Sequence, residues 1–286
     1  MDWLKRRAAE HRAALAERHH AVFHPAPWAR LAPALTVIAV MAVAAFAIWR
    51  LDFSLARLAT GLGHLMKFLS LMFPPATGGQ FGTFLQAMGE TLAIAFLGTL
   101  IAAVLAVPFG FLAARNVISG LFAHLAVRRF LDVIRGVDVL IWALIFINVV
   151  GLGPFAGILA IAVADLGVFG KLFSEAVEAA DGTPTDGVIA AGGTRLHVIR
   201  FGLVPQVLPV MLSQVMYYFE SNTRSATIIG IVGAGGIGLQ LAEQIRLYEW
   251  DKVAVLIAVI LVTVAIIDSI SRRLRLAVIG SVSVPL

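Results

Sequence analysis

The sequence predicts an all-α integral membrane protein with six transmembrane helices, because of its composition, its long uncharged segments and the distribution of its basic residues. Hydrophobic residues make up 60% of the 286 residues, charged residues only 14%, and the mean hydropathy is +0.92. A soluble domain has about 45–50% apolar and about 25% charged residues. A soluble fold of this size cannot bury so much apolar surface, so we expect the helices to lie in a bilayer.

Apolar segments long enough to cross a bilayer recur along the chain, since a spanning helix needs about 20 such residues. Four stretches contain no Asp, Glu, Lys or Arg: Leu31–Trp49, Thr91–Ala114, Phe201–Phe219 and Val253–Ile267. The apolar stretch over residues 139–170 is too long for one helix, and Gly151, Gly153 and Pro154 divide it. We therefore predict spans at residues 31–49, 90–113, 131–150, 154–175, 202–221 and 252–270.

The basic residues predict that both termini are cytoplasmic. With this orientation 16 of the 22 Lys and Arg residues lie inside, as the positive-inside rule requires. A seventh span over residues 225–242 would move the Arg272–Arg275 cluster outside, so six spans fit better. The net charge of +5 and the pI of about 10.1 are explained by this cytoplasmic basic surface near anionic lipid, and we expect no nucleic-acid partner.

The chain is expected to have four regions. Residues 1–29 contain Lys5, Arg6 and Arg7 beside Trp3 and Leu4, which is typical of a basic amphipathic helix in the cytoplasm or on the membrane surface, not a cleaved signal. Residues 30–84 hold the first span and an outer loop. Residues 85–275 form the core, and residues 276–286 a tail.

A glycine-rich segment, "TIIGIVGAGGIGLQLAEQ" at residues 227–244, imitates a dinucleotide-binding turn. It contains Gly233, Gly235, Gly236 and Gly238, and Glu249 follows where a ribose-binding carboxylate would be sought. The predicted topology places it on the outer side, with no βαβ unit around it, which argues against an oxidoreductase. We instead expect close helix packing or a short re-entrant loop there, with a gating role as the alternative.

A polar loop at residues 182–201 is expected on the cytoplasmic face. Thr183, Pro184 and Asp186 suit a helix start, and Gly192 and Gly193 interrupt the apolar stripe that follows. Thr194 can cap a second short helix, and Pro205 opens the next span. The pattern predicts a helix–glycine–helix elbow, apolar enough to dock in a groove, although an ordinary amphipathic loop has a similar periodicity.

This loop resembles the EAA loop of binding-protein-dependent ABC importer permeases. Gly192 stands at the glycine of that motif and Pro205 at its terminal proline. Asp186 stands at its glutamate, while Gly187 and Val188 replace its two alanines. Arg195 and Arg200 match positions that are commonly basic. The resemblance implies that the elbow couples the chain to an ATPase.

Four further stretches together resemble the phosphonate-importer permeases over about residues 85–275: "ALIFINVVGLGPFAG", "GKLFSEAVEA", "HVIRFGLVPQVLP" and "FESNTRSATIIGIVGAGGIG". The resemblance implies a type I (MetI-like) importer fold, a homodimer in the bacterial inner membrane, two copies of a separate ABC ATPase and a periplasmic phosphonate-binding protein. The chain has no G-x-x-x-x-G-K-[ST] motif, so ATP and Mg²⁺ are expected on the partner ATPase.

Polar residues within or beside the spans are candidates for the translocation pathway, since a charge at the bilayer centre costs about 2.5–3.5 kcal/mol. Glu220 and Arg224 are four residues apart and can pair, either as a structural pair near the outer interface or, with Ser221 and Asn222, at an outer entrance that attracts an anion. Asn148 and Asp165 can serve helix packing or the pathway.

Other polar residues have structural explanations. Asp138 is expected to pair with Arg135, and Glu90 to cap the second span. His19, His20, His24 and His197 show no metal-ligand spacing and there is no cysteine, so no metal site is predicted.

Two alternative functions remain open on the sequence. The first is an ABC permease for another solute, such as phosphite, phosphate or methionine. The second is a membrane scaffold or secondary carrier, which would work without an ATPase. In the ABC hypothesis, closure of the ATPase moves the elbow at Gly192, and the spans change from inward-open to outward-open.

Overall fold

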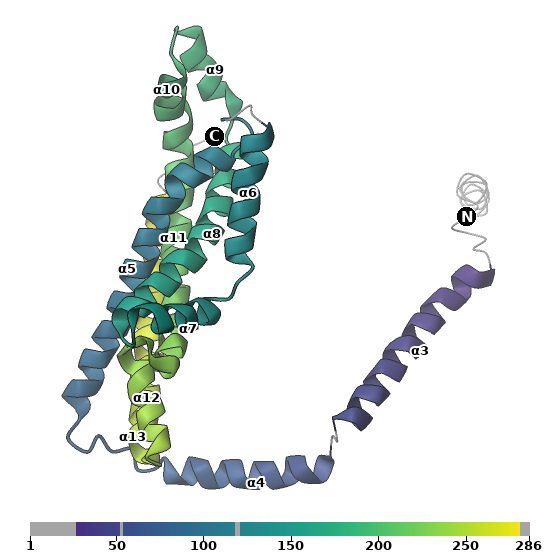
Figure 1. Ribbon diagram of the computed structural model, residues 1–286, viewed down its shortest axis with the longest axis vertical. Coiled ribbons are helices and arrows are strands. Elements are labelled where there is room, and N and C mark those ends of the chain that lie inside the picture. The colour runs from purple at the N-terminus through teal and green to yellow at the C-terminus, as the bar shows by residue number, and fades with distance from the viewer. Residues whose placement is uncertain (1–26, 52–53, 118–120, 281–286) are drawn as a thin grey trace, which may run out of the picture. The chain divides into compact units, whose positions relative to one another are not determined.

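The computed structural model describes residues 27–51, 54–117 and 121–280, and within these ranges every regular element is a helix (Figure 1). The chain divides into two units, residues 1–67 and 68–286. The expected amphipathic helix at residues 1–29 lies almost wholly outside the described residues, as does most of the tail at residues 276–286. An all-helical fold is confirmed for the part that is described.

The first unit contains α3 (Pro27–Arg50), and its apolar part from Pro33 is long enough to cross a membrane, which confirms the first predicted span. Large apolar side chains such as Leu35, Ile38 and Phe46 are exposed along it, as a lipid-facing helix requires. Most of α4 (Leu55–Leu71) follows within the same unit. This region was expected to be a loop, but leucines recur every three or four residues here and form an amphipathic helix.

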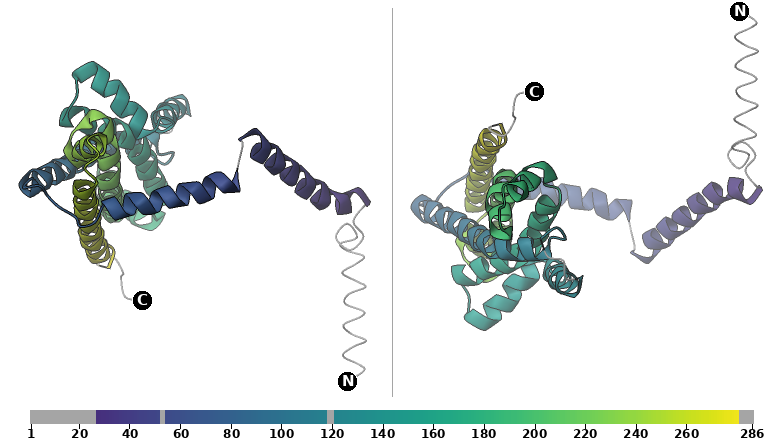
Figure 2. Two further views of the ribbon diagram at one scale, coloured as in Figure 1. Left: turned by 90° about the horizontal axis from the view of Figure 1, so that it is seen from below. Right: turned by 90° about the horizontal axis from the view of Figure 1, so that it is seen from above.

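The second unit is a bundle built on four long helices: α5 (Phe81–Ala113), α8 (Pro154–Glu178), α11 (Val204–Ile229) and α13 (Trp250–Gly280). Each lies in a helical segment long and apolar enough to cross a membrane, so the second, fourth, fifth and sixth predicted spans are confirmed. Both end-on views in Figure 2 show these helices gathered into one bundle.

Small residues bring α5 and α8 close together. A Cβ atom added to Gly98 would lie 2.7 Å from Ile161 Cβ, and one added to Gly110 would lie 2.6 Å from Phe173 Cβ. Only glycine therefore fits at these two crossing points, which is the usual way in which membrane helices pack without a hydrophobic driving force between them.

The third predicted span, at residues 131–150, is wrong as a single helix. α6 (Leu121–Arg135) and α7 (Val139–Val150) meet at 84°. Asp138 does not pair with Arg135 as expected; its carboxylate caps α7 by accepting the Leu140 N–H at 2.8 Å. α7 alone is about 18 Å long, too short to cross a bilayer. The described chain thus has five helices able to span, or six if the bent pair counts as one.

The glycine-rich segment packs closely, as predicted. α11 runs into a π-helical turn, η2 (Gly230–Ala234), and then α12 (Gly236–Arg246). Gly233 and Gly235 have φ angles of 110° and 84°, which residues with a side chain rarely adopt. The described residues contain no strand here, so no βαβ unit exists. Gly153 N donates to Gly233 O at 3.0 Å and ties this segment to the start of α8.

Glu90 does not cap the second span. α5 begins at Phe81, so Glu90 lies in its third turn and cannot satisfy the N–H groups of the helix start. Its carboxylate instead lies beside the glycine-rich segment, 2.9 Å from where a Cβ of Gly235 would stand.

The elbow lies at the opposite end of α8 and α11 from the glycine-rich segment (Figure 1). It consists of α9 (Gly182–Ala190), α10 (Arg195–His197) and the π-helical turn η1 (Val198–Leu203). Pro205 opens α11, where a missing N–H has no cost. The helix–glycine–helix shape is therefore confirmed.

Candidate functional site

The first candidate site is the elbow, which is fastened to α11 at its base. The Gln206 side chain accepts from Asp181 N at 3.0 Å and donates to Asp181 O at 3.1 Å. It also donates to Gly202 O at 2.7 Å. A Cβ on Gly202 would lie 2.9 Å from Thr185 Cγ2, so α9 packs closely on η1. α9 is therefore tied to the start of α11 by hydrogen bonds and by close packing.

Both helices of the elbow have a side-chain cap at their start. Asp181 is the N-cap of α9, and it accepts from Thr183 N at 3.0 Å and from the Thr183 hydroxyl at 3.0 Å. These bonds, the backbone one first, lower the pKa of Asp181. The cap is consequently present at neutral pH and is lost only as the pH falls through that lowered pKa. Thr194 caps α10, as predicted, together with His197.

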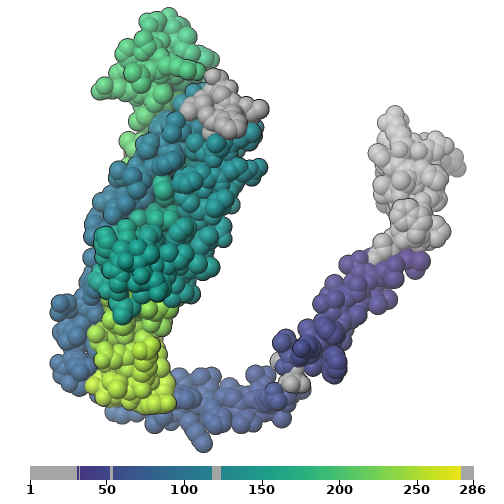
Figure 3. All heavy atoms as spheres, viewed as in Figure 1, coloured from purple at the N-terminus to yellow at the C-terminus, as the bar shows by residue number. Residues whose placement is uncertain are grey.

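Glycine is required at the bend. Gly192 has a φ angle of 78°, and a Cβ on Gly193 would lie 2.6 Å from Val188 Cγ1. Beyond this bend the elbow forms a projection at one end of the second unit (Figure 3). Leu196 is 77% exposed and Ile189 58% exposed at its surface. The remaining residues predicted for coupling on this projection, Asp186, Gly187, Arg195 and Arg200, are also exposed.

The second candidate site is a polar cluster inside the bundle. Asn222 of α11 donates through its amide to Thr99 Oγ1 of α5 at 2.8 Å and to Asp165 Oδ2 of α8 at 2.5 Å. All three side chains are buried. Asp165 lies half-way along α8, so the cluster joins three helices at the middle of their spans.

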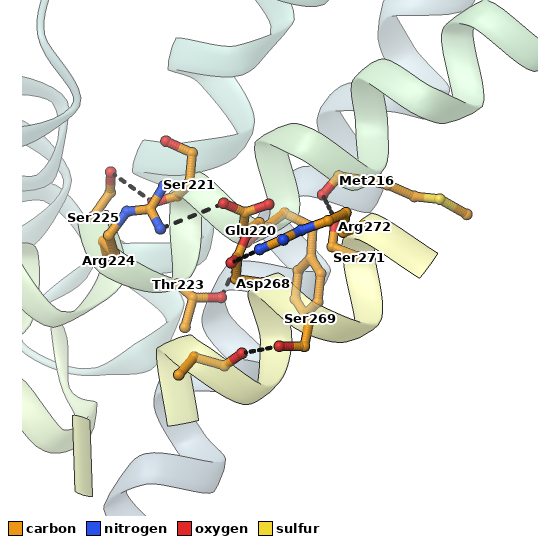
Figure 4. Close-up of polar contacts among 12 residues, drawn as sticks. Met216, Glu220, Ser221, Thr223, Arg224, Ser225, Asp268, Ser269, Ser271 and Arg272 are labelled. Atoms are coloured by element: carbon orange, nitrogen blue, oxygen red, sulfur yellow. Dashed lines mark hydrogen bonds and ion pairs between the residues drawn. The ribbon is translucent and has the colours of Figure 1, made fainter. Parts of the chain in front are cut away.

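Two residues before Asn222 on α11, two arginines converge on the carboxylate of Glu220, and we call Glu220, Arg224 and Arg275 the charge cluster. Arg224 Nη1 lies 3.5 Å from Glu220 Oε1, which confirms the predicted pair, and Arg275 Nη2 lies 3.3 Å from Glu220 Oε2. Figure 4 shows Arg224 and Glu220 turned toward each other from successive turns of α11. The three side chains of the charge cluster together carry a formal charge of +1.

This position corrects the expected outer entrance. α11 continues without a break to Ile229, and Asn222 contacts the middle of α8, so Ser221, Asn222 and Arg224 lie within the span. α13 accompanies them, because Ser271 Oγ donates to Met216 O at 3.1 Å (Figure 4). The spacing Glu220–Arg224 could be found from sequence, whereas Arg275 is 55 residues away and gives no local signal.

Arg135 was expected at the cytoplasmic surface but lies deeper. A Cβ on Gly167 would stand 2.8 Å from the Arg135 backbone N, so the end of α6 is level with the middle of α8. The straight third span predicted from sequence places Arg135 at the end of a helix, whereas the bend between α6 and α7 brings it to the middle of α8. Asn148, by contrast, is not drawn into either cluster; it is exposed on α7 and donates to Leu144 O at 2.7 Å.

One face of α11 carries polar residues along an otherwise apolar span. Tyr217, Ser221 and Arg224 recur at helical spacing, and the Arg224 side chain is 47% exposed whereas that of Glu220 is 9% exposed. A surface depression of about 480 Å³ lies on this face beside Tyr217. Its lining residues are Leu172, Ser213, Gln214, Tyr217, Tyr218 and Arg275. A half-exposed guanidinium at this depth is too costly to face hydrocarbon, so this surface faces water or protein.

A larger cavity, of about 570 Å³, opens beside the glycine-rich segment. Gly153, Val232, Gly233, Glu243 and Arg246 are among its lining residues. Of the four glycines singled out from the sequence, only Gly233 lines it; Gly235, Gly236 and Gly238 are buried in helix contacts. Among the described residues no group of three or more His, Cys, Asp or Glu side chains is placed to hold a metal ion.

We expect Asn222→Ala to destabilise the bundle by about 1–2 kcal/mol, because it removes the donor to Thr99 and Asp165 from a buried site. The measurement is the apparent melting temperature of the purified protein in detergent. Ser221→Ala is the matched control, because Ser221 is the residue before Asn222 and its side chain is only half-buried. Equal melting temperatures for the two variants would contradict a structural role for the Thr99–Asp165–Asn222 cluster.

Comparison with known proteins agrees with this arrangement. The family model described as binding-protein-dependent transport system inner membrane component matches residues 106–278. A putative phosphite transport system permease protein of Stutzerimonas stutzeri is 38% identical over 250 residues, which cover 87% of each chain. A putative cryptic phosphonate transport system permease protein of Escherichia coli K12 is 47% identical over 117 residues, 41% of this chain and 96% of that protein.

A solved structure shows the same fold at lower identity. The inward-facing MetNI methionine ABC transporter matches with a TM-score of 0.63 and 20% identity, over 71% of this chain and 99% of that chain.

Proposed function

The chain belongs to the family of binding-protein-dependent transport system inner membrane components, and on this premise we propose that it carries a phosphorus oxyanion, a phosphonate in the first instance, through the face of α11 that bears Arg224. It is a multi-pass membrane protein and a permease subunit of an ABC importer. It is not an enzyme: ATP hydrolysis belongs to a separate ATPase chain, and a binding protein delivers the solute.

The charge cluster carries the cargo proposal. Glu220 neutralises one of its two arginines, so the cluster has an excess positive charge at the middle of the span. At 3.5 Å the Arg224–Glu220 pair is longer than a strong charge-assisted hydrogen bond, about 2.7–2.9 Å. The half-exposed guanidinium of Arg224 therefore keeps donors for a phosphonate group, whose oxygens match its planar fork. The names of the phosphite and phosphonate permeases quoted above favour the same cargo class.

The partially buried side of the cluster has a different role in this proposal. Glu220 holds Arg224 in place and offsets part of its positive charge, so that an anion binds weakly enough to leave, and Arg275 fixes Glu220 from α13. Asp165 contributes no ligand, because a carboxylate would repel the cargo; with Asn222 it joins the helices that must move together. Ser221 lies on the same face as Arg224, and Asn148 lines the pathway on α7.

The elbow transmits the work of the ATPase. Exposed Ile189 and Leu196 enter a groove of the ATPase, with Asp186, Arg195 and Arg200 at the polar rim. Gly187, Gly192 and Gly193 allow the bend. The hydrogen bonds of Gln206 with Asp181 and Gly202 pass the motion of the elbow to α11, just after Pro205. The glycines of the glycine-rich segment act as a gate, because they let α11 and α12 shift against each other.

The assembly that we infer is a homodimer in the bacterial inner membrane, with the two Arg224 faces turned toward a shared axis. Two copies of the ATPase bind ATP and Mg²⁺ on the cytoplasmic side, and a phosphonate-binding protein docks from the periplasm. The half-exposed arginine at mid-span supports this arrangement, because a second copy shields it from lipid.

The direct test is uptake of a radiolabelled phosphonate into vesicles that contain the chain with its ATPase and binding protein. We expect Arg224→Gln to lower the uptake rate about tenfold, since it removes the half-exposed donor. Arg273→Gln, which removes an exposed arginine from α13, is the control and should keep wild-type uptake. Wild-type uptake by Arg224→Gln would rule out this residue as a cargo contact, and uptake without the ATPase would rule out the importer itself.

A further inference from the structure

A small cavity at the elbow end of the second unit is lined by six charged or polar residues together with Leu125 and Leu131. It lies between α6, α8 and the turn after α5, and it has a volume of about 200 Å³. We call it the basic pocket, and its polar lining consists of Arg115, His124, Arg128, Arg129, Asp132 and Lys171. It is separate from the charge cluster and from the elbow, and the transport mechanism makes no use of it.

The basic pocket has an excess of positive charge. Asp132 pairs with Arg129 at 3.2 Å and with Lys171 at 3.7 Å. Glu178 pairs with Arg128 at 3.0 Å and accepts the Arg115 backbone N–H at 2.9 Å. Four cations thus face two carboxylates, which leaves two positive charges uncompensated when His124 is neutral.

Two donors at the pocket lack acceptors. Arg115 Nε donates to His124 Nε2 at 3.4 Å, so in the neutral imidazole the hydrogen is on Nδ1. His124 is 3% exposed, and neither its Nδ1 nor Arg128 Nε has a hydrogen-bond partner within the described residues. Buried polar groups are normally paired, so the polar groups behind this pocket are not fully satisfied within the described residues.

We propose that the basic pocket binds a phosphate group. A phosphate offers several acceptor oxygens and one or two negative charges, which match the charge excess and the cationic side chains of the lining, and arginine recognises it through parallel hydrogen bonds. The pocket lies on the basic side of the predicted topology, where both free phosphate and the phosphodiester of an anionic lipid are available. A bound phosphate holds α6 against α8 and so steadies the bent third span.

The test uses the full chain in nanodiscs of phosphatidylcholine and measures its melting temperature by tryptophan fluorescence. Inorganic phosphate is titrated in one arm, and phosphatidylglycerol replaces part of the lipid in the other. We expect one of the two to raise the melting temperature. The double variant Arg129→Gln/Lys171→Gln should raise the half-saturating concentration about tenfold, because two cations are lost. Asp132→Asn should lower it, an effect that misfolding cannot imitate.

A control separates this site from other basic surfaces. Arg273→Gln removes an exposed cation from α13 and should keep the wild-type response. A response to phosphate alone identifies the free anion, and a response to phosphatidylglycerol alone identifies lipid. No response in either arm, or the same response in the double variant as in the wild type, would overturn the proposal.

Discussion

Replacing Leu196 with Asp should abolish ATP-driven uptake and leave the permease folded. Leu196 is 77% exposed on the elbow and makes no part of the core, so the substitution costs little in the isolated chain. In the assembly that we propose, it places a carboxylate in an apolar groove of the ATPase. Truncating or charging such an anchor costs about 3 kcal/mol, which is about 100-fold in affinity.

The measurement is phosphonate uptake and ATPase rate in vesicles with all three components, together with co-purification of the ATPase. Leu247→Asp is the matched control: it introduces the same charge at a leucine that is 59% exposed, but between α12 and α13 at the opposite end of the bundle. The Leu247→Asp variant should still co-purify with the ATPase. If Leu196→Asp transports at the wild-type rate, the elbow is not the coupling element.

The second large effect is expected at Gly238, where Gly238→Ala should prevent a stable bundle. Its added Cβ would lie 2.0 Å from Thr227 O and 2.9 Å from Gly230 Cα, both backbone atoms that cannot rotate away. α12 must then move away from α11, and the buried cluster that Ile237 of α12 forms with residues of α5 and α13 must shift with it. Overpacking costs about 1–3 kcal/mol when side chains yield, so we expect at least about 3 kcal/mol where only backbone can move.

This prediction is checked by the yield of monodisperse protein in detergent and by its melting temperature. Gly89→Ala is the control, because Gly89 is exposed within α5 and its added Cβ would meet nothing within 4 Å. Alanine is the better helix former there and should raise stability by up to about 1 kcal/mol. A Gly238→Ala protein as stable as Gly89→Ala would show that α11 and α12 do not cross as closely as the structure has them.

The bend between α6 and α7 bears on function as well as on topology. It brings Arg135 to the level of Gly167, and so places another exposed guanidinium at the depth of the Thr99–Asp165–Asn222 cluster. The middle of the bundle is therefore richer in positive charge than the apolar spans suggest.

The amino-acid sequence by itself determined the spans at α3, α5, α8, α11 and α13, the elbow on the opposite end from the glycine-rich segment, and the Glu220–Arg224 pair. These features depend on neighbouring residues: on apolar length, on helix breakers and on four-residue spacing. Local chemistry is enough to specify them.

Only the tertiary structure decided the 84° bend at Asp138, the bonds of Asn222 to Thr99 and Asp165, and the approach of Arg275 to Glu220. A polar residue in a span can turn toward lipid, a neighbouring helix or a pathway, and the sequence of its own helix does not choose among them. The choice follows from how the helices rotate and cross, and small residues such as Gly98, Gly110 and Gly167 on other helices set those crossings.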